Sequence, residues 1–259
     1  MKPDVFKQYQ AESENWLKRG RRSLLHSLLL EANQTARSTK PLNILEVGAG
    51  VGQNIPTLQE FGQVEVVEVS DIGLAALKDI PNINQIYSTP IPFNLNKTYD
   101  IICALDVVEH IEDDKTAVQW LVDRLKPDGY LITTVPAYQW LFSDHDIALG
   151  HYRRYTQRTF NRILPSELTV LKSGYFNSVL FLLAAAIRLF KRFTKRISPQ
   201  KKPAELKKES STVPRWIDSA FGSFLLVETK VIERNPIFPF GLSVFCLAKK
   251  TTTDSPSHF

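Results

Sequence analysis

The sequence predicts an α/β fold in which helices cover both faces of a largely parallel sheet. Two observations indicate this class. Strand-like and helix-like segments alternate from residue 43 to residue 135, and the run YDIICAL has the pattern of a strand that is buried on both faces. A third observation, the stretch LEVGAGVGQN at 45–54, places glycine at 48, 50 and 52. Glycines at this density predict a loop that turns sharply or lets a ligand approach the backbone.

The first elements follow from apolar runs and helix-start signals. NILEV (43–47) predicts a strand, and the following segment predicts a helix with Pro56 in its first turn, where proline is tolerated. VEVVEV (64–69) predicts a second strand. Ser70 and Asp71 then offer N-cap oxygens to a helix over IGLAALKDI.

Three further strands are expected before residue 136. INQIY (83–87) predicts the third strand and YDIICAL (99–105) the fourth. The segment from Lys115 to Leu125 places its apolar residues on one helical face. The tetrapeptide KPDG (126–129) then predicts a turn into a fifth strand, YLITTV.

Composition predicts an ordinary globular protein with one substantial domain, because 43% of the 259 residues are hydrophobic and 23% are charged. The two cysteines lie in apolar strand-like runs, so we expect buried thiols, a reducing compartment and no disulfide framework. The N-terminus lacks the apolar core of a signal peptide. The apolar, uncharged stretch 174–187 has fourteen residues, whereas a membrane-spanning helix needs about 20. A cytoplasmic protein is expected.

The net charge of +5 is concentrated in one block. Seven basic residues and no acid fall within 188–202: Arg188, Lys191, Arg192, Lys195, Arg196, Lys201 and Lys202. Such a block is commonly a solvated surface, but it also suits a membrane surface, nucleic acid or an anionic substrate.

The glycine stretch lies at the carboxyl end of the first predicted strand, where open α/β sheets bind ligands as the strand order reverses. Dinucleotide-binding loops favour the spacing G-x-G-x-x-G, and here the third glycine comes one residue early. Glu46 precedes the first glycine by two residues. Glu68, at the end of the second strand, is placed to accept hydrogen bonds from ribose hydroxyls.

These residues resemble the class I S-adenosylmethionine-dependent methyltransferases. The stretch at 46–52 is similar to the family's first signature, E-x-G-x-G-x-G, VVEVSD to its second, and YDIICALDVVEHIEDD with LKPDGYLITTVP to its later signatures. The likeness runs from about Ile44 to Pro136. It implies a Rossmann-like, doubly wound sheet of seven strands whose last strand, GLSVFCLAKK (241–250), pairs antiparallel with the sixth, ELTVLKSGYF (167–176).

The resemblance also implies a methyltransferase that uses S-adenosylmethionine as its cofactor. The glycine loop and the end of the fourth strand would approach the methionine part of the cofactor. The family often carries an acid after the third strand to bind the adenine amino group, whereas Ser88 stands nearest here. Adenine recognition is then expected to use backbone atoms and apolar packing. The implied cofactor-binding residues are Glu46, Gly48, Gly50, Gly52, Glu68, Val69, Ser88, Ala104, Leu105 and Asp106.

The segment SDHDIALGHYRRYT (143–156) is the best candidate for the acceptor site, because it concentrates titratable and aromatic groups. GHYRRYT is similar to a segment in uncharacterised bacterial members of the family. The candidate catalytic bases are His110, His145 and His151, and the candidate substrate-binding residues here are Tyr152, Arg153, Arg154 and Tyr155. An internal network of Asp–Arg pairs is the alternative for this loop, and loop shaping is the alternative for His110. The spacing matches no metal-ligand set, so no metal is expected.

The expected organisation has four parts. They are an N-terminal helical lid (1–38), a methyltransferase core (39–176 and 236–250), a helical insertion (177–235) and a disordered tail (251–259). Tyr9, Trp16 and Arg22 are candidate substrate contacts in the lid, with packing onto the sheet edge as the alternative. Segment 178–196, apolar and then basic, resembles an interfacial membrane anchor. A buried cap helix or a dimer interface are its alternatives, and nucleic acid is disfavoured because the basic residues lack interleaved stacking aromatics.

The predicted function is methyl transfer, by preference O-methylation because of the nearby histidines, to a small, anionic or lipid-linked acceptor. Two alternatives remain at this stage. A protein of the same fold that binds the cofactor without turnover is one, and a nicotinamide-dependent oxidoreductase, disfavoured by the glycine spacing, is the other. The oligomeric state, monomer or dimer, and peripheral contact with the inner membrane face stay open.

Overall fold

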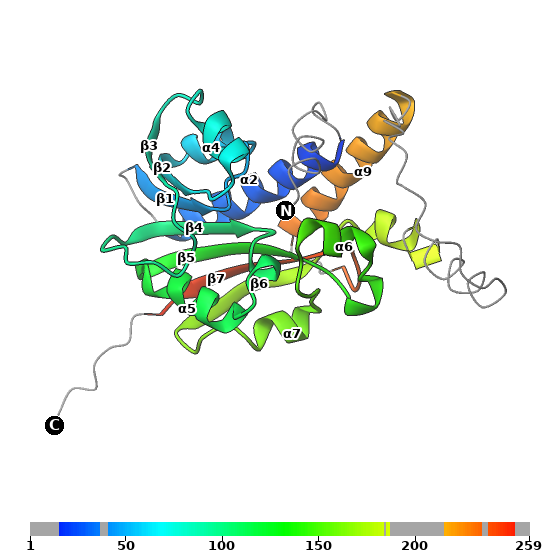
Figure 1. Cartoon of the computed structure of the whole chain (residues 1–259). Coiled ribbons are helices and arrows are strands. Elements are labelled where there is room, and N and C mark those ends of the chain that lie inside the picture. Colours follow the sequence, from blue (N-terminus) through cyan, green and yellow to red (C-terminus); the bar gives the residue numbers. More distant parts are fainter. Residues whose placement is uncertain (1–15, 37–40, 184, 187–214, 235–237, 252–259) are drawn as a thin grey trace.

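The computed structural model describes residues 16–36, 41–183, 185–186, 215–234 and 238–251, and within them the chain forms one seven-stranded sheet (Figure 1). The strands are β1 (Leu42–Val47), β2 (Gly62–Val67), β3 (Ile83–Tyr87), β4 (Tyr99–Leu105), β5 (Leu125–Pro136), β6 (Leu168–Phe176) and β7 (Ser243–Lys250). Their order is β3-β2-β1-β4-β5-β7-β6. The first five strands run parallel, and β7 lies antiparallel between β5 and β6. The predicted fold class and the antiparallel last strand are confirmed.

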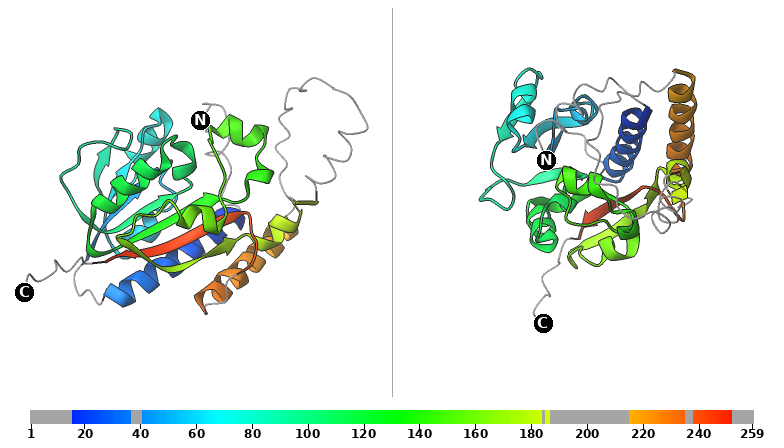
Figure 2. Two further views of the ribbon diagram at one scale, coloured as in Figure 1. Left: turned by 90° about the horizontal axis from the view of Figure 1, so that it is seen from below. Right: turned by 45° about the vertical axis from the view of Figure 1, so that its right-hand side comes forward.

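Helices cover both faces of the sheet. The helices are α2 (Trp16–Ala36), α3 (Ile55–Gln59), α4 (Asp71–Leu77), α5 (Asp114–Asp123), α6 (Asp144–Leu149), α7 (Gln157–Asn161) and α9 (Arg215–Glu233), with 3-10 turns η1 (Val108–His110) and η2 (Gln139–Leu141). Helices α2 and α9 lie side by side on one face (Figure 2). Helices α5 and α7 contribute to the apolar cluster on the other face. Because alternate residues of the central strands join the two clusters, each face of the sheet has its own core.

Local signals in the sequence account for several helix starts. Ser70 is the N-cap of α4, and its side chain accepts a hydrogen bond from the backbone N–H of Gly73 at 3.5 Å. Asp113 caps α5 in the same way through Thr116. Pro56 lies in the first turn of α3, as expected.

The start of the fifth strand differs from the prediction. Strand β5 begins at Leu125, ahead of the predicted turn KPDG. The pairing with β4 passes from Tyr99↔Leu125 directly to Ile101↔Tyr130, so these four residues bulge out of the ladder. Asp128, at the bulge, has a φ of 62°. The tetrapeptide therefore does bend the chain, but within a longer strand.

Helix α2 begins at Trp16, so Arg22 lies within this helix. Its leucines 24, 25, 28 and 29 are buried in the core on the α2 side of the sheet. Both cysteines are buried free thiols, as predicted. No helix among the described residues is both long and apolar enough to cross a bilayer.

Several predictions lie partly outside the described residues. Tyr9, the basic block 188–202, most of segment 178–196 and the tail beyond residue 251 are not described. The described parts of the predicted insertion are residues 177–183 and 185–186, which are helical from 178 on, and α9. The division of the chain into lid, core, insertion and tail stays a prediction.

Candidate active site

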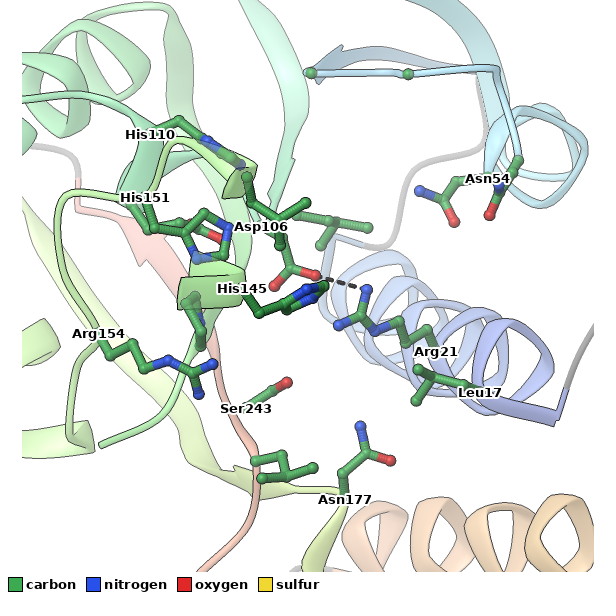
Figure 3. A pocket seen from close by; sticks show the side chains of 18 of the residues that line it. Leu17, Arg21, Asn54, Asp106, His110, His145, His151, Arg154, Asn177 and Ser243 are labelled. Atoms are coloured by element: carbon green, nitrogen blue, oxygen red, sulfur yellow. Dashed lines mark ion pairs between the residues drawn. The ribbon is translucent and has the colours of Figure 1, made fainter. Parts of the chain in front are cut away.

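A cavity of about 460 Å³ lies at the carboxyl ends of β1 and β4 (Figure 3). In the sheet, β2 and β3 lie on one side of β1, and β4 and β5 lie on its other side. The strand order therefore reverses between β1 and β4. This is where open α/β sheets bind ligands, and it is the position that the glycine stretch predicts for the ligand. The loop after β1, the end of β4 with η1, helix α6 and the start of α2 all contribute to the lining.

The three glycines of the first loop have different roles. All have positive φ: 73° at Gly48, 57° at Gly50 and 79° at Gly52. A Cβ at Gly48 would meet the Val107 side chain, and a Cβ at Gly52 would overlap Ile80. At Gly50 no other atom lies within 4 Å of the position of a Cβ. Gly48 and Gly52 therefore permit packing, while Gly50 leaves open space on the side of the cavity that it lines.

Glu68 fixes the shape of this loop. Its carboxylate accepts hydrogen bonds from the backbone N–H groups of Gly50 (2.6 Å), Ser70 (2.7 Å) and Val69 (3.0 Å). Since an ionised carboxylate offers about four acceptor sites, one remains for a further donor. Glu68 thus joins the glycine loop to the start of α4.

Glu46 lies behind the cavity wall and is 1% exposed. Its Oε1 accepts a hydrogen bond from Asn54 Nδ2 at 2.7 Å, and its buried Oε2 has no hydrogen-bond partner. Burial raises the pKa of Glu46 to about 8, with a smaller rise from the charge of Glu68, while the Asn54 hydrogen bond lowers it. Glu46 therefore carries a proton at neutral pH and orients Asn54, which lines the cavity.

Asp106 stands at the end of β4 with a φ of 55°. Thr134 Oγ1 donates a hydrogen bond to its Oδ1 at 3.1 Å, and Arg21 Nη1 lies 2.7 Å from its Oδ2. Figure 3 shows this ion pair, in which Arg21 reaches Asp106 from the first half of α2. The pair sets one negative and one positive group side by side, an arrangement complementary to the ammonium and carboxylate of an amino acid.

Two histidines and an acid form another wall. The rings of His110 and His151 meet edge to face with centroids 4.6 Å apart, and Figure 3 places the two rings side by side. Burial and the neighbouring His151 lower the pKa of His110 to about 4, so its ring is neutral at physiological pH. Glu109 is fully buried and neither carboxyl oxygen has a hydrogen-bond partner. Burial, with the charge of Asp106, raises the pKa of Glu109 well above its usual range.

Asp146 organises the loop that carries His151 and Arg154. It is fully buried in α6, and Ser143 caps that helix through a reciprocal pair of hydrogen bonds with it. His151 Nδ1 lies 3.0 Å from Asp146 Oδ1, and Arg154 contacts both oxygens through Nε (2.7 Å) and Nη2 (3.1 Å). Although burial raises the pKa of Asp146, hydrogen bonds from His151 and Arg154 hold it well below its usual range.

Comparison with known families decides the class of protein. The model of the family described as "Methyltransferase domain" matches residues 16–171, more than half of the chain. The chain belongs to this methyltransferase family. The methyltransferase is 32% identical over 117 residues to a ubiquinone biosynthesis O-methyltransferase of Rickettsia conorii, covering 42% of this chain and 40% of that protein. A protein of the same description from Rickettsia typhi is 26% identical over 182 residues, covering 62% of this chain and 74% of that protein. The methyltransferase thus spans only about two fifths of the R. conorii relative.

Solved structures share the fold of the methyltransferase. The plantazolicin methyltransferase BpumL, bound to a pentazolic substrate analogue and S-adenosyl-L-homocysteine (SAH), matches with a TM-score of 0.58 and 14% identity, covering 96% of this chain and 92% of that one. A protein from Galdieria sulphuraria described as a sarcosine dimethylglycine methyltransferase matches with a TM-score of 0.53 and 18% identity, covering 86% of this chain and 84% of that one. At such identities these likenesses establish the fold alone.

The cofactor of the methyltransferase is S-adenosylmethionine, and the cavity fits it. The open space beside Gly50 admits a ligand against the backbone, and the Arg21–Asp106 pair suits the amino-acid end. Glu68, with its remaining acceptor site, and the 55% exposed Val69 lie at the end of β2, and the exposed Ser88 lies at the end of β3. Gly48, Gly50, Leu105 and Asp106 line the cavity directly. The other predicted cofactor residues are not in its lining, and their role stays a prediction: Glu46, Gly52, Glu68, Val69, Ser88 and Ala104.

The predicted acceptor residues divide into two groups. His110, His145, His151 and Arg154 line the cavity, as Figure 3 shows. Arg153 pairs with Asp114 at 2.8 Å, and Tyr155 donates a hydrogen bond to Asp114 at 2.9 Å. Outside the lining lie Trp16, Arg22, Tyr152, Arg153 and Tyr155. The contacts of Arg153, Arg154 and Tyr155 fit the internal Asp–Arg network that the sequence left open, and a role for these residues in substrate binding stays a prediction.

Arg21, Glu109 and Asn177 are among the polar cavity residues that were not predicted from the sequence. Arg21 lies four residues after Leu17, so both fall on the helix face that reaches the cavity, whereas Arg22 is turned by about 100°. His110 was predicted as a site residue, whereas the neighbouring Glu109 was not. Asn177, just after β6, has a φ of 65° and a buried Oδ1 without a hydrogen-bond partner, and nothing in its local sequence singles it out.

Proposed function

We propose that the methyltransferase transfers a methyl group from S-adenosylmethionine to a hydroxyl oxygen of a small acceptor that binds against the His110–His151 wall. The observation that carries the proposal is the division of the cavity. Gly50, Asp106 and Arg21 line one part and suit the methyl donor, while the histidines line another part and suit a hydroxyl.

The chemistry needs little more than alignment. When bound, S-adenosylmethionine supplies an activated methyl group to a nucleophile. The protein must hold the acceptor oxygen in line with that group and exclude water. A hydroxyl must also lose its proton before or during attack, and a neutral imidazole can accept one. His145, in α6, points toward the Arg21–Asp106 pair in Figure 3, which supports a place for it near both substrates.

Apolar side chains complete the acceptor side of the cavity. Leu141, Leu149, Leu180 and Leu242 line it. This lining suits an acceptor that carries an apolar group beside its hydroxyl. The description of the Rickettsia relatives as ubiquinone biosynthesis O-methyltransferases supports a hydroxyl acceptor of the same general kind, possessing an apolar or lipid-linked part.

We further propose that the described start of segment 178–196 serves such an acceptor by peripheral contact with the inner membrane face from the cytoplasm. Leu182 and Leu183 are 56% and 52% exposed, beyond Leu180 in the cavity lining. An apolar surface that continues from the cavity would let an acceptor stay partly in the lipid boundary. A cap over the cavity or a dimer contact are the competing uses of the same side chains.

The test compares acceptors that differ in the attacked atom. The full chain is incubated with S-adenosylmethionine and matched sets of phenols, catechols and amines, with and without an alkyl tail, and methylated products are identified by mass spectrometry. We expect methyl ethers, with faster turnover for tailed acceptors. Methylated amines alone would contradict the proposed oxygen nucleophile, and cofactor binding without any product would indicate a protein that binds but does not catalyse.

A further inference from the structure

Glu109, His110 and His151 bring three metal-ligating side chains to one point of the cavity wall. Their ligand atoms, one from each residue, all lie within 4.8 Å of one another. Ligand atoms around a tetrahedral ion with bonds of about 2.0–2.2 Å lie roughly 3.4 Å apart. Small rotations of these side chains would therefore close the group around one ion. From this geometry we propose that Glu109, His110 and His151 bind a divalent transition-metal cation.

The buried carboxylate of Glu109 supports a cation more directly than the spacing does. Both of its oxygens are buried and have no hydrogen-bond partner, although the side chain borders the cavity. A buried ionised group without a partner is costly, and a buried protonated carboxyl still lacks the hydrogen bonds that it could make. A divalent cation would supply the missing partner.

The histidines are held as metal ligands usually are. His151 Nδ1 faces Asp146 Oδ1 at 3.0 Å, which leaves Nε2 for another partner. A carboxylate behind a ligating histidine fixes its tautomer and orientation. The ring of His110 makes a hydrogen bond to the backbone of Gly150, which orients it in the same way. Asp146, which orients His151, lies in α6, and Gly150, which orients His110, directly follows α6.

The surrounding charges allow a cation here. Arg21 and Arg154 are the nearby positive side chains, and each is paired, with Asp106 and Asp146 respectively. Ionised Glu109 is then the unbalanced charge of the group. Two imidazoles with one carboxylate favour zinc, iron or manganese over magnesium, which prefers an all-oxygen set.

This site would deepen the proposed O-methylation, and its chemical role rests on that proposal. Three protein ligands leave a coordination position open toward the cavity. A cation there lowers the pKa of a hydroxyl that it binds. The hydroxyl proton leaves to His145 or to water, the oxygen lone pair forms the new bond to the methyl carbon, and the carbon–sulfur bond of the donor breaks. His145 would then be the base, with His110 and His151 as ligands.

The test measures metal binding apart from turnover. The full chain is stripped with EDTA and titrated by calorimetry with Zn²⁺, Mn²⁺ and Mg²⁺. Cys103 and Cys246 are buried and do not offer a competing thiol site. We expect one Zn²⁺ per chain, weaker Mn²⁺ binding and little heat with Mg²⁺. Folded protein that binds neither Zn²⁺ nor Mn²⁺ would overturn the proposal.

Three variants locate the ion. Changing a contact behind a metal ligand costs roughly 10–100-fold in affinity, so loss of a ligand in Glu109→Gln or His151→Asn should cost at least about 100-fold. His145→Ala is the matched control, because it removes a histidine of the same cavity and should leave Zn²⁺ affinity unchanged. Equal weakening in all three variants would refute the site.

The two proposals fail separately. Zn²⁺ bound through Glu109 and His151, with no hydroxyl acceptor methylated, would leave the cation site standing and reject O-methylation. Methyl ether formation by protein that binds no ion would support O-methylation and reject the cation site.

Discussion

The substitution Gly50→Val tests what the glycine loop holds. Gly50 has a φ of 57°, and no other atom lies within 4 Å of the position of a Cβ. The Cβ of the valine would therefore have free space around it, and the side chain would enter the space that we assign to S-adenosylmethionine. The backbone strain of a non-glycine residue in the left-handed region costs roughly 1–2 kcal/mol.

The expected loss of affinity is larger than the loss of stability. Inserting extra carbon atoms into a filled site costs typically about 1–3 kcal/mol, occasionally more, and each 1.4 kcal/mol corresponds to about tenfold in Kd. A branched side chain of three carbons should thus weaken cofactor binding by roughly 5- to 150-fold. Calorimetry gives the Kd, and urea denaturation gives the free energy of unfolding.

The matched comparison is Gly52→Ala. A Cβ at Gly52 would overlap the Ile80 side chain, so this variant should lose stability through packing rather than through the cavity. A folded Gly50→Val protein that binds S-adenosylmethionine with the wild-type Kd would refute the assignment of the loop.

Three further predictions concern charged groups around the cavity. Arg21→Ala should raise the Kd of S-adenosylmethionine by about 10–100-fold, since a hydrogen bond to a charged group contributes about 1.5–3 kcal/mol, while a partly exposed pair with Asp106 adds little to stability; an unchanged Kd in calorimetry would contradict this. Because the pKa of Glu46 is raised to about 8, the folded state keeps a proton that the unfolded state has lost above its ordinary value of 4.5, so the free energy of unfolding should fall as pH rises from about 4.5 to 8. Glu46→Gln should flatten that slope in urea denaturation at pH 5 and pH 8, and an unaltered slope would count against it. Arg154→Ala removes the guanidinium that pairs with both oxygens of the buried Asp146 and leaves that carboxylate only its contacts with Ser143 and His151, so it should lower the free energy of unfolding by about 3–5 kcal/mol; a loss below about 1 kcal/mol would favour a role of Arg154 in binding substrate.

Much of the fold was predictable because its signals are local. The apolar runs of β1 and β4, the N-cap at Ser70 and the glycine spacing each act within a few residues. Bulging of residues 126–129 was not predictable in the same way, because it depends on how β5 pairs with β4. The turn-forming residues indicated a bend, but they did not indicate that β5 pairs with β4 both before and after the bend.

The location of the site could be predicted from the sequence, but only some of its residues could. The end of a parallel strand places Gly50 and Asp106 together, and this follows from topology. The approach of His151 to Glu109 and His110 joins segments about forty residues apart, through helix α6 and the buried Asp146. A search for metal ligands at a fixed spacing within one segment cannot find such a group. Arg21 was missed because its role depends on which face of α2 meets the cavity.

Calorimetric titration of the full chain with S-adenosylmethionine and, separately, with NADH tests the central claim most directly. The glycine loop and the Arg21–Asp106 pair predict micromolar binding of S-adenosylmethionine and no binding of NADH. Binding of NADH alone, or of neither compound, would contradict the claim that this cavity holds a methyl donor.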